Sequence, residues 1–181
     1  FEKIVNGLRK EKRPYKGILY LGGMVVGGKV YVIEFNARWG DPEAEVILPS
    51  FENDLYEVSI AITSGKLQNL KIKTDKKVRV AVAATAKGYP LDYKLVKGKK
   101  VLGLEKAQGV SGIKIYGAGI KKTDGEYIVN GGRVLYTVGE GKNVVDAREK
   151  AYKAMALIGI EGDNLHYRID IGWRDLERMK E

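Results

Sequence analysis

Residues 32–45, with the sequence VIEFNARWGDPEAE, concentrate acidic and amide side chains at the end of a run typical of a β-strand. Alternate residues of a strand face the same side, so Glu34 and Asn36 would project together while Phe35 faces the other way. A carboxylate and an amide oxygen suit Mg²⁺ or Mn²⁺, and Mg²⁺ commonly completes its shell with phosphate oxygens and water. The spacing therefore predicts a metal and phosphate site, with a solvated strand edge or a cap as the alternative.

Arg38 follows two residues later and would lie on the same side if the strand continued that far. A guanidinium can bind an anionic group with two hydrogen bonds. A metal ion, a phosphate and an arginine are together the components of phosphoryl transfer. This combination makes phosphoryl transfer the first chemistry to consider.

The composition excludes several other kinds of chemistry. The 181 residues contain no cysteine, which excludes disulfides, thiolate catalysis and cysteine-ligated zinc. His166 is the only histidine, which argues against a histidine metal site or a Ser/His/Asp triad. Any reaction would have to rely on carboxylates, arginine, lysine and the backbone.

The formal net charge of +9 is concentrated in residues 77–181, where 20 Lys and Arg stand against 13 Asp and Glu, a net of +7. Such an excess is compatible with nucleic acid, a membrane surface or anionic small molecules. The lysines scatter over expected loops and strand edges, which they can protect from pairing, so we do not expect nucleic-acid binding. Neither a membrane span nor a signal peptide is recognisable, so we expect a cytoplasmic protein with no membrane partner.

The first part of the chain predicts two helices and a β-hairpin. Apolar residues at helical spacing predict a helix over 1–12. A Gly-Gly pair at 27–28 lies between two β-rich runs and predicts a two-residue hairpin turn. Asp54 predicts the start of a further helix, which we expect to end near Ser64.

From Val78 onward, short β-like segments alternate with Gly, Pro and Asp, which predicts a meander of strands. One amphipathic helix follows, with Asn143 as its N-cap and Gly159 as its stop, and its apolar stripe should pack on the sheet. A last helix is expected within 167–181. The pattern predicts an α+β fold of two units that meet near residue 76.

The string E-F-N-x-R-x-G-D-P-E at residues 34–43 resembles the motif of ATP-grasp ligases. Its G-D-P-E ending resembles in particular the glycinamide ribonucleotide synthetases, or phosphoribosylamine–glycine ligases. Further segments resemble this family in the same order along the chain. They are YKGILYLGGM at 15–24, GYP at 88–90, NGGRV at 130–134 and DIGWR at 170–174.

The resemblance implies the C-terminal part of an ATP-grasp domain at residues 1–76, followed by a small β-rich C-terminal domain with one packed helix at 77–181. Members of this family carry an N-terminal domain and the first part of the ATP-grasp unit before the matching point. We therefore expect the missing N-terminal portion of the same enzyme as a partner, and no activity from this chain alone. Residues 17–32 contain no acidic residue, so a second metal held entirely by protein ligands is not expected.

The reaction implied joins glycine to 5-phosphoribosylamine with ATP, giving glycinamide ribonucleotide, ADP and phosphate through a glycyl phosphate. The resemblance implies that Glu34 and Asn36 hold Mg²⁺ or Mn²⁺ against the ATP phosphates. Arg38 would be the catalytic residue, stabilising the transferring phosphoryl group or the acyl phosphate.

Three residues are candidates for substrate binding. Asp41 and Glu43 would contact the glycine ammonium or the ribosylamine hydroxyls, although Asp41 could equally shape the turn. Arg133, which follows a Gly pair, would anchor the ribose phosphate, with a surface ion pair as the alternative.

Three alternatives stay open. The chain could belong to another ATP-grasp enzyme of purine synthesis that uses formate or bicarbonate, against which G-D-P-E argues. A basic nucleic-acid-binding module is an alternative of a different class, and it predicts affinity that falls steeply with salt. The chain could also be an assembly unit without catalysis of its own.

Overall fold

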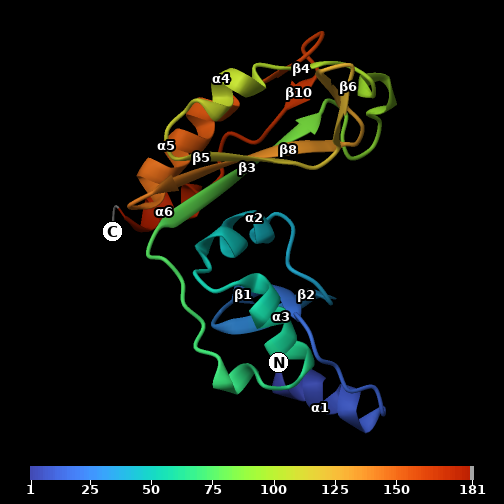
Figure 1. The fold of residues 1–181 in the computed structure, drawn as a ribbon, viewed down its shortest axis with the longest axis vertical. Helices are drawn as coiled ribbons and strands as arrows, with labels where there is room; N and C mark the ends of the chain where they lie inside the picture. Colours follow the sequence, from blue (N-terminus) through green and yellow to red (C-terminus); the bar gives the residue numbers. More distant parts are fainter. Residues whose placement is uncertain (180–181) are drawn as a thin grey trace. The chain divides into compact units, whose positions relative to one another are not determined.

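The computed structural model describes residues 1–179, and their contacts divide the chain into two compact units. Unit 1 comprises Phe1–Ala44 and Ser50–Asp75, while unit 2 comprises Glu45–Pro49 and the chain from Lys76 onward. Helices and strands occur in both units, which confirms the expected α+β class (Figure 1). The assignment of the two parts to ligase domains stays a prediction.

Unit 1 is built around one antiparallel hairpin. Its elements are α1 (Glu2–Lys10), β1 (Tyr20–Val26), β2 (Lys29–Asn36), α3 (Leu55–Thr63) and the 3-10 helix η2 (Leu67–Asn69). The φ angles of Gly27 and Gly28 are +54° and +74°, which a two-residue hairpin turn requires and glycine adopts without strain. The predicted hairpin is therefore confirmed.

Helix α3 begins where the sequence predicts. The Asp54 carboxylate accepts a hydrogen bond of 2.7 Å from the backbone N–H of Tyr56, and so satisfies one of the free donors of the first turn. Gly65 follows the helix with a φ of +71°.

The acidic segment after β2 holds a helix that the sequence analysis did not predict. Helix α2 (Glu43–Ile47) and the 3-10 helix η1 (Leu48–Ser50) follow Pro42 directly. The five residues of α2 are too few for a periodic pattern to be recognised, and isolated helices of this length are unstable in water.

Unit 2 contains a four-stranded antiparallel sheet in the order β10-β3-β8-β5. Its strands are β3 (Val78–Ala86), β5 (Ile113–Gly117), β8 (Arg133–Gly141) and β10 (Leu165–His166). Two-stranded pairs flank it, formed by β4 (Val101–Leu102) with β9 (Gly159–Ile160) and by β6 (Ile120–Thr123) with β7 (Glu126–Val129). The remaining elements are η3 (Lys94–Val96), α4 (Leu104–Gln108), α5 (Val144–Met155) and α6 (Trp173–Arg178).

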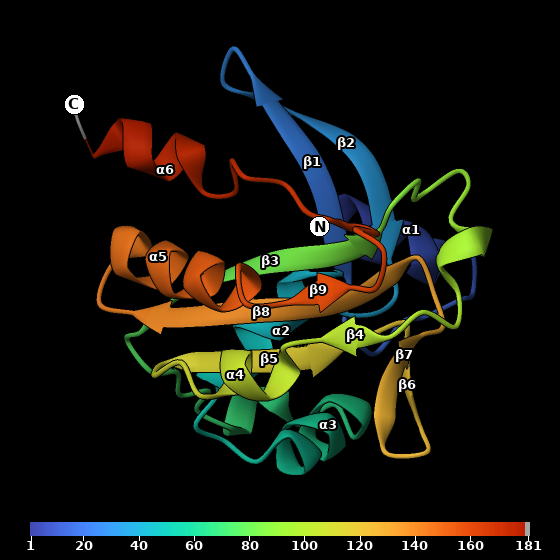
Figure 2. The same ribbon diagram turned by 90° about the horizontal axis from the view of Figure 1, so that it is seen from above.

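Helix α5 covers one face of this sheet, as Figure 1 and Figure 2 both show. Asn143 caps it by accepting a hydrogen bond of 2.9 Å from the N–H of Asp146. Ala147, Ala151 and Met155 are fully buried, which confirms the predicted packing of the apolar stripe. The predicted stop at Gly159 is wrong, because α5 ends at Met155 and Gly159 begins β9. A Cβ added to Gly139 on β8 would collide with the backbone of α5, so this glycine allows the close approach.

The short elements of unit 2 were not all predicted. Strands β9 and β10 have two residues each, and α4 has five. Their sequences carry too few residues to show a period, so only the surrounding structure selects their conformation. No helix among residues 1–179 has the length and apolar character that a bilayer crossing requires.

Candidate active site

The two predicted metal ligands lie at the end of β2 in unit 1. Glu34 is paired with Gly22 of β1, and Asn36 is paired with Tyr20. Because β2 includes both residues and the side-chain period of a strand is two, Glu34 and Asn36 share one face of the hairpin. This part of the predicted arrangement follows directly from the observed strand.

Glu34 is exposed, and glycine at position 22 makes room for it. A Cβ on Gly22 would lie 3.0 Å from Cγ of Glu34 and 3.6 Å from Cε1 of Tyr20. The Glu34 side chain and the Tyr20 ring therefore both lie beside the Cα of Gly22. A larger residue at this position would push against the carboxylate stem.

Asn36 is half-buried, and its amide is not fixed by a hydrogen bond at nitrogen. Nδ2 is inaccessible to solvent and has no hydrogen-bond partner. An amide nitrogen without a partner leaves the group free to turn its oxygen toward a cation at no cost in hydrogen bonds at that atom. Glu34 and Asn36 thus offer two hard oxygens, a donor set that fits a divalent cation bound through phosphates.

No three Asp, Glu or His side chains in the described part of the chain gather closely enough to hold a metal ion by themselves. A cation bound by Glu34 and Asn36 would need further ligands from elsewhere. Phosphate oxygens and water complete such a shell in nucleotide-using enzymes. The geometry favours a site completed by its substrate over a closed structural metal site.

Arg38 does not continue the strand. Strand β2 ends at Asn36, and the Arg38 guanidinium donates a hydrogen bond of 2.8 Å from Nη1 to the carbonyl of Trp39. The condition under which Arg38 would share the strand face is therefore not met, because β2 ends at Asn36 and the chain bends at residues 37–38. The side chain is exposed, so its charge remains available to an anion.

A tyrosine that the sequence analysis did not single out links the strand to the acidic turn. The Tyr20 hydroxyl donates a hydrogen bond of 3.0 Å to Oε1 of Glu43, the first residue of α2. Gly40 is buried beneath this contact: a Cβ there would collide with Oε2 of Glu43 and lie 2.8 Å from Cε2 of Tyr20. Asp41, by contrast, is exposed.

The electrostatics around Tyr20 reflect the same cluster. The hydrogen bond to Glu43 raises the pKa of Tyr20 above its ordinary value, and burial and the charges of Glu43 and Glu34 raise it further. The positive charge of Arg38 acts in the opposite direction. The phenol is therefore held in its protonated, donating form, with two carboxylates and the guanidinium close enough to act on it.

Arg133 lies in unit 2, at the start of β8. Its Nη1 is 3.4 Å from the hydroxyl of Tyr136. The two glycines that precede Arg133 have no open space beside them for a phosphate. The ring of Tyr89 fills the space beside Gly132, and the backbone of Gly119 lies against Gly131. The glycines therefore serve packing, and the role of Arg133 rests on its guanidinium alone.

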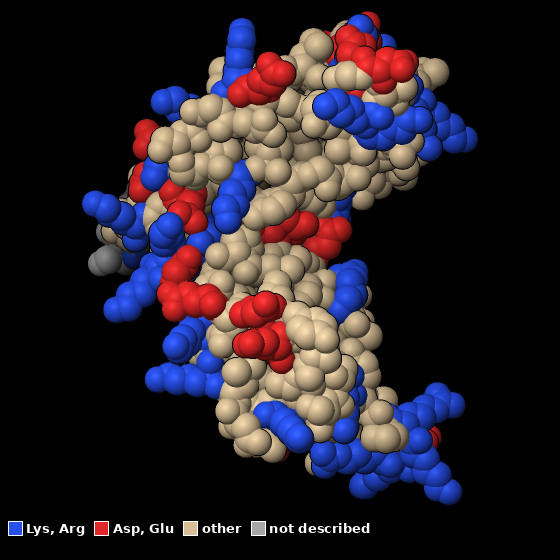
Figure 3. All heavy atoms as spheres, viewed as in Figure 1, with Lys and Arg blue, Asp and Glu red and all other residues tan. Residues whose placement is uncertain are grey.

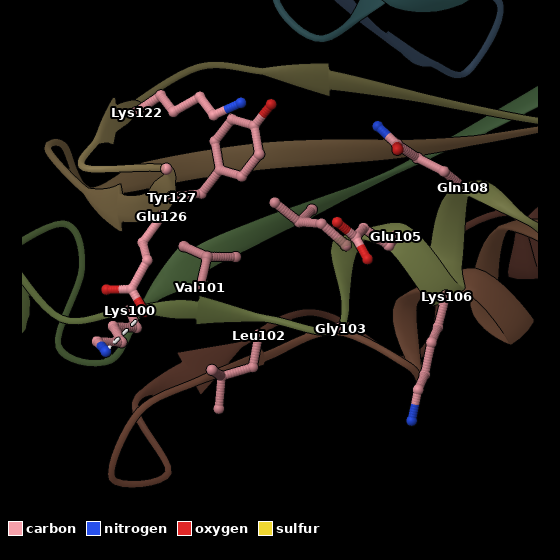
Figure 4. Close-up of a pocket in the computed structure, with 12 residues that line it drawn as sticks. Lys100, Val101, Leu102, Gly103, Glu105, Lys106, Gln108, Lys122, Glu126 and Tyr127 are labelled. Atoms are coloured by element: carbon pink, nitrogen blue, oxygen red, sulfur yellow. Dashed lines mark hydrogen bonds and ion pairs between the residues drawn. The ribbon is translucent and has the colours of Figure 1, made fainter.

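A separate cavity of about 430 Å³ lies in unit 2 and contains none of the predicted site residues. Figure 4 shows the Lys122 side chain beside the Tyr127 ring at this cavity, with 5.4 Å between Nζ and the ring centroid. Lys100 and Glu126 form an ion pair of 2.7 Å on its lining. Hydrophobic and charged groups are mixed there, without a convergent set of polar groups.

Comparison with known proteins gives two family matches. Residues 79–174 match the C domain of phosphoribosylglycinamide synthetase, and residues 1–44 match the ATP-grasp (A) domain of the same synthetase. The second match contains Glu34, Asn36 and Arg38, and the first contains Arg133.

Several curated relatives are similar over nearly the whole chain. Identity is 43% to phosphoribosylamine–glycine ligase of Caldanaerobacter subterraneus, over 93% of this chain and 39% of the relative. Identity to the Haemophilus influenzae phosphoribosylamine–glycine ligase is 38%, over 96% of this chain and 40% of the relative. Identity to the trifunctional purine biosynthetic protein adenosine-3 of Bos taurus is 40%, over 99% of this chain and 17% of the relative. The chain thus spans about two fifths of the ligases that it matches.

Solved structures agree with these matches. The crystal structure of phosphoribosylamine–glycine ligase from Thermotoga maritima superimposes with a TM-score of 0.69 and 34% identity, over 92% of this chain and 39% of that one. N5-carboxyaminoimidazole ribonucleotide synthetase from the same organism superimposes with a TM-score of 0.54 and 17% identity, over 87% of this chain and 40% of that one. At this identity the comparison shows a shared fold alone.

Proposed function

Because this chain belongs to the phosphoribosylglycinamide synthetase family, we propose that it works as the C-terminal portion of an ATP-dependent phosphoribosylamine–glycine ligase. The observation that carries the proposal is the placement of E-F-N-A-R-W-G-D-P-E at the end of β2, inside the region that matches the ATP-grasp domain. The enzyme would form glycinamide ribonucleotide, ADP and phosphate from glycine, 5-phosphoribosylamine and ATP, as a cytoplasmic step of purine synthesis.

The chemistry is demanding because a glycine carboxylate is a poor electrophile. One carboxylate oxygen would take the γ-phosphoryl group of ATP, which forms glycyl phosphate as the bond to ADP breaks. The amine nitrogen of phosphoribosylamine then attacks the carbonyl carbon, phosphate leaves, and the nitrogen loses a proton. Both steps depend on positioning and charge neutralisation more than on covalent help from the protein.

The residues of unit 1 would supply that neutralisation. Glu34 and Asn36 would hold Mg²⁺ or Mn²⁺, whose charge lowers the repulsion between the phosphates and the incoming carboxylate. The exposed guanidinium of Arg38 would stabilise the transferring phosphoryl group. Asp41 would bind the glycine ammonium or the ribosylamine hydroxyls, and Glu43 contributes to the same turn.

Arg133 would bind the phosphate of phosphoribosylamine. A guanidinium binds phosphate with two parallel hydrogen bonds, and its position at the start of β8 places it on a rigid element. We further propose that catalysis needs the portion that the relatives carry ahead of the matching residues, so this chain alone should be inactive. Titration of the isolated chain with Mg-ATP should show no micromolar binding.

The decisive experiment is Glu34→Gln in the complete ligase, assayed by ADP release that depends on glycine and phosphoribosylamine. We expect turnover to fall by about 100-fold or more, because the amide loses the charge that a divalent cation requires. The unfolding midpoint should not change, since Glu34 is exposed. Glu52→Gln, an exposed glutamate of the same unit, is the matched control. Unchanged turnover at saturating Mg²⁺ would refute the role of Glu34.

The same assay separates the alternatives. Phosphate release that depends on formate or bicarbonate instead of glycine would identify a different ATP-grasp reaction. The nucleic-acid alternative has little support in the surface: on the face shown in Figure 3, Lys and Arg are interspersed with Asp and Glu. Ion pairs such as Lys77 with Glu140 and Arg168 with Asp170 neutralise part of the positive charge of unit 2.

A further inference from the structure

Tyr20 and Glu43 form a side-chain contact that spans the predicted site. Tyr20 lies on β1, opposite Asn36, and Glu43 is the first residue of α2. Between Asn36 and Glu43 the chain leaves the hairpin, bends at residues 37–38 and turns at residues 41–42 before α2 begins. The hydrogen bond of 3.0 Å therefore closes this six-residue excursion at its base.

Gly40 is closely packed beneath the contact. Gly40 is buried, with the Glu43 carboxylate and the Tyr20 ring in the space that a side chain would fill. The N–H of Ala44 donates to the carbonyl of Gly40 at 2.9 Å, which ties the start of α2 to the same residue. The Tyr20 ring also lies beside Gly22, which faces the stem of Glu34. Tyr20 thus hydrogen-bonds to Glu43 and lies near the glycine that faces Glu34.

We propose that Tyr20 is a positioning residue: by holding Glu43, it fixes the segment that carries Arg38 and Asp41 relative to Glu34 and Asn36. In this role Glu43 is a structural residue, called the strut below, whose carboxylate accepts the hydrogen bond from Tyr20. Binding of substrate by its charge would then be of secondary importance. The inference rests on the proposed ligase function for its kinetic consequence, but the geometric part stands without it.

Glu43 as the acceptor for Tyr20 and Glu43 as a substrate ligand make different predictions for variants at positions 20 and 43. A positioning role needs only an acceptor at residue 43, so Glu43→Gln should lower kcat less than Glu43→Ala does, because the amide oxygen can still accept from Tyr20. Tyr20→Phe and Glu43→Ala should each lower kcat about tenfold, with KM for glycine unchanged. Loss of a contact that orients the residues touching metal or substrate typically has an effect of this size. The double variant should be no slower than either single one, because both remove the same contact.

Tyr15→Phe is the matched control. Tyr15 is also half-buried in unit 1, and its hydroxyl donates a hydrogen bond of 2.8 Å to the carbonyl of Ile18. The control loses a phenolic hydrogen bond to a backbone carbonyl of the same unit and should keep wild-type kcat. A tyrosine that only stabilised the unit would lower the unfolding midpoint in both variants without changing kcat.

Hydrogen exchange on the same preparations separates this inference from the ligase proposal. The Ala44 amide should exchange faster in Tyr20→Phe than in wild type, and should be unchanged in Tyr15→Phe. A wild-type protein without glycine-dependent ADP release would refute the proposed function, while the exchange result would still test the strut. Equal exchange and equal kcat for Tyr20→Phe and Tyr15→Phe would overturn the inference. Loss of activity in Glu43→Gln with a raised KM for glycine would also overturn it, and would assign Glu43 to the substrate.

Discussion

Unit 1 and unit 2 differ sharply in how much apolar surface they bury. Among residues 1–179, Val58 is the only hydrophobic side chain of unit 1 that is buried, at 6% exposed, while the buried core of unit 2 runs through the sheet and α5. On the hairpin of unit 1, Val25 and Ile33 are 70% and 68% exposed. The buried core is thus concentrated in unit 2, while unit 1 carries all the predicted site residues except Arg133.

The exposed hairpin explains why local contacts matter so much in unit 1. A two-stranded hairpin alone is marginal in water, because it buries too little apolar surface to offset the entropy of ordering. Neighbouring residues of β2, such as Tyr31 and Val32, face opposite sides and both are exposed, so the described residues cover neither face. Hydrogen bonds such as Tyr20 to Glu43 then hold the site in place of a core.

The comparison can be tested most strongly by removing one buried side chain from each unit. Leu135→Ala should destabilise unit 2 by about 2–5 kcal/mol, because Leu135 is fully buried and leaves a cavity under α5. Val58→Ala should cost unit 1 only about 1–2 kcal/mol. The two tryptophans allow separate readouts by urea unfolding, since Trp173→Phe leaves Trp39 to report on unit 1 and Trp39→Phe leaves Trp173 to report on unit 2.

The two single-tryptophan proteins, without either alanine substitution, give the baseline for that test. Trp39 should show an unfolding midpoint at lower urea than Trp173. A single coincident transition for both reporters, or a larger loss from Val58→Ala than from Leu135→Ala, would contradict the proposed difference between the units.

Much of the fold was readable in the sequence where the signal is local. The Gly-Gly turn, the caps Asp54 and Asn143 and the apolar stripe of α5 all depend on neighbouring residues, and all are confirmed. Short elements such as α2 and α4 were missed because tertiary contacts select them.

The candidate site was predictable only in part, and the reason is a single irregularity. A regular hairpin closed at 27–28 would place Tyr20 opposite Phe35. The register shifts between Gly22 and Gly23, so Tyr20 lies opposite Asn36 instead. A β-bulge has no reliable sequence signal beyond a glycine, and therefore the link from Tyr20 to Glu43 could not be derived beforehand.

A second prediction concerns the acid stability of unit 2. Hydrogen bonding to Lys77 lowers the pKa of Glu140 below its ordinary value, and the charge of Arg79 lowers it further, while burial acts in the opposite direction. The Arg79 side chain is only 4% exposed, and its Nη2 donates to Glu140 at 2.7 Å. Glu140→Gln should destabilise unit 2 by about 1–2 kcal/mol at neutral pH, because charge-assisted hydrogen bonds become neutral ones.

The sign of the pH dependence follows from the lowered pKa. The stability that Glu140 contributes is fully present above its unfolded pKa and is lost as the pH falls through the folded value. Below about pH 4.5, the unfolding free energy reported by Trp173 should therefore fall less steeply in Glu140→Gln than in wild type. Glu149→Gln, an exposed glutamate of α5, is the control. Parallel curves for Glu140→Gln and wild type would contradict the assignment, and an effect at Trp39 would show that the units are not independent.

The smallest expected effects come from the matched helix caps, one in each unit. Asp54→Ala and Asn143→Ala each remove a side-chain acceptor from a first-turn N–H, and such losses typically cost about 1 kcal/mol. Because α5 is packed into the core, the loss at Asn143 should appear in the global unfolding of unit 2. Helix α3 has one buried residue, so the loss at Asp54 should appear first as faster amide exchange within 55–63. Asp54→Asn and Asn143→Asp keep the cap and serve as controls. An equal shift of both urea midpoints would mean that α3 is as firmly coupled to its unit as α5 is, and the contrast between the two units would then reduce to their buried area alone.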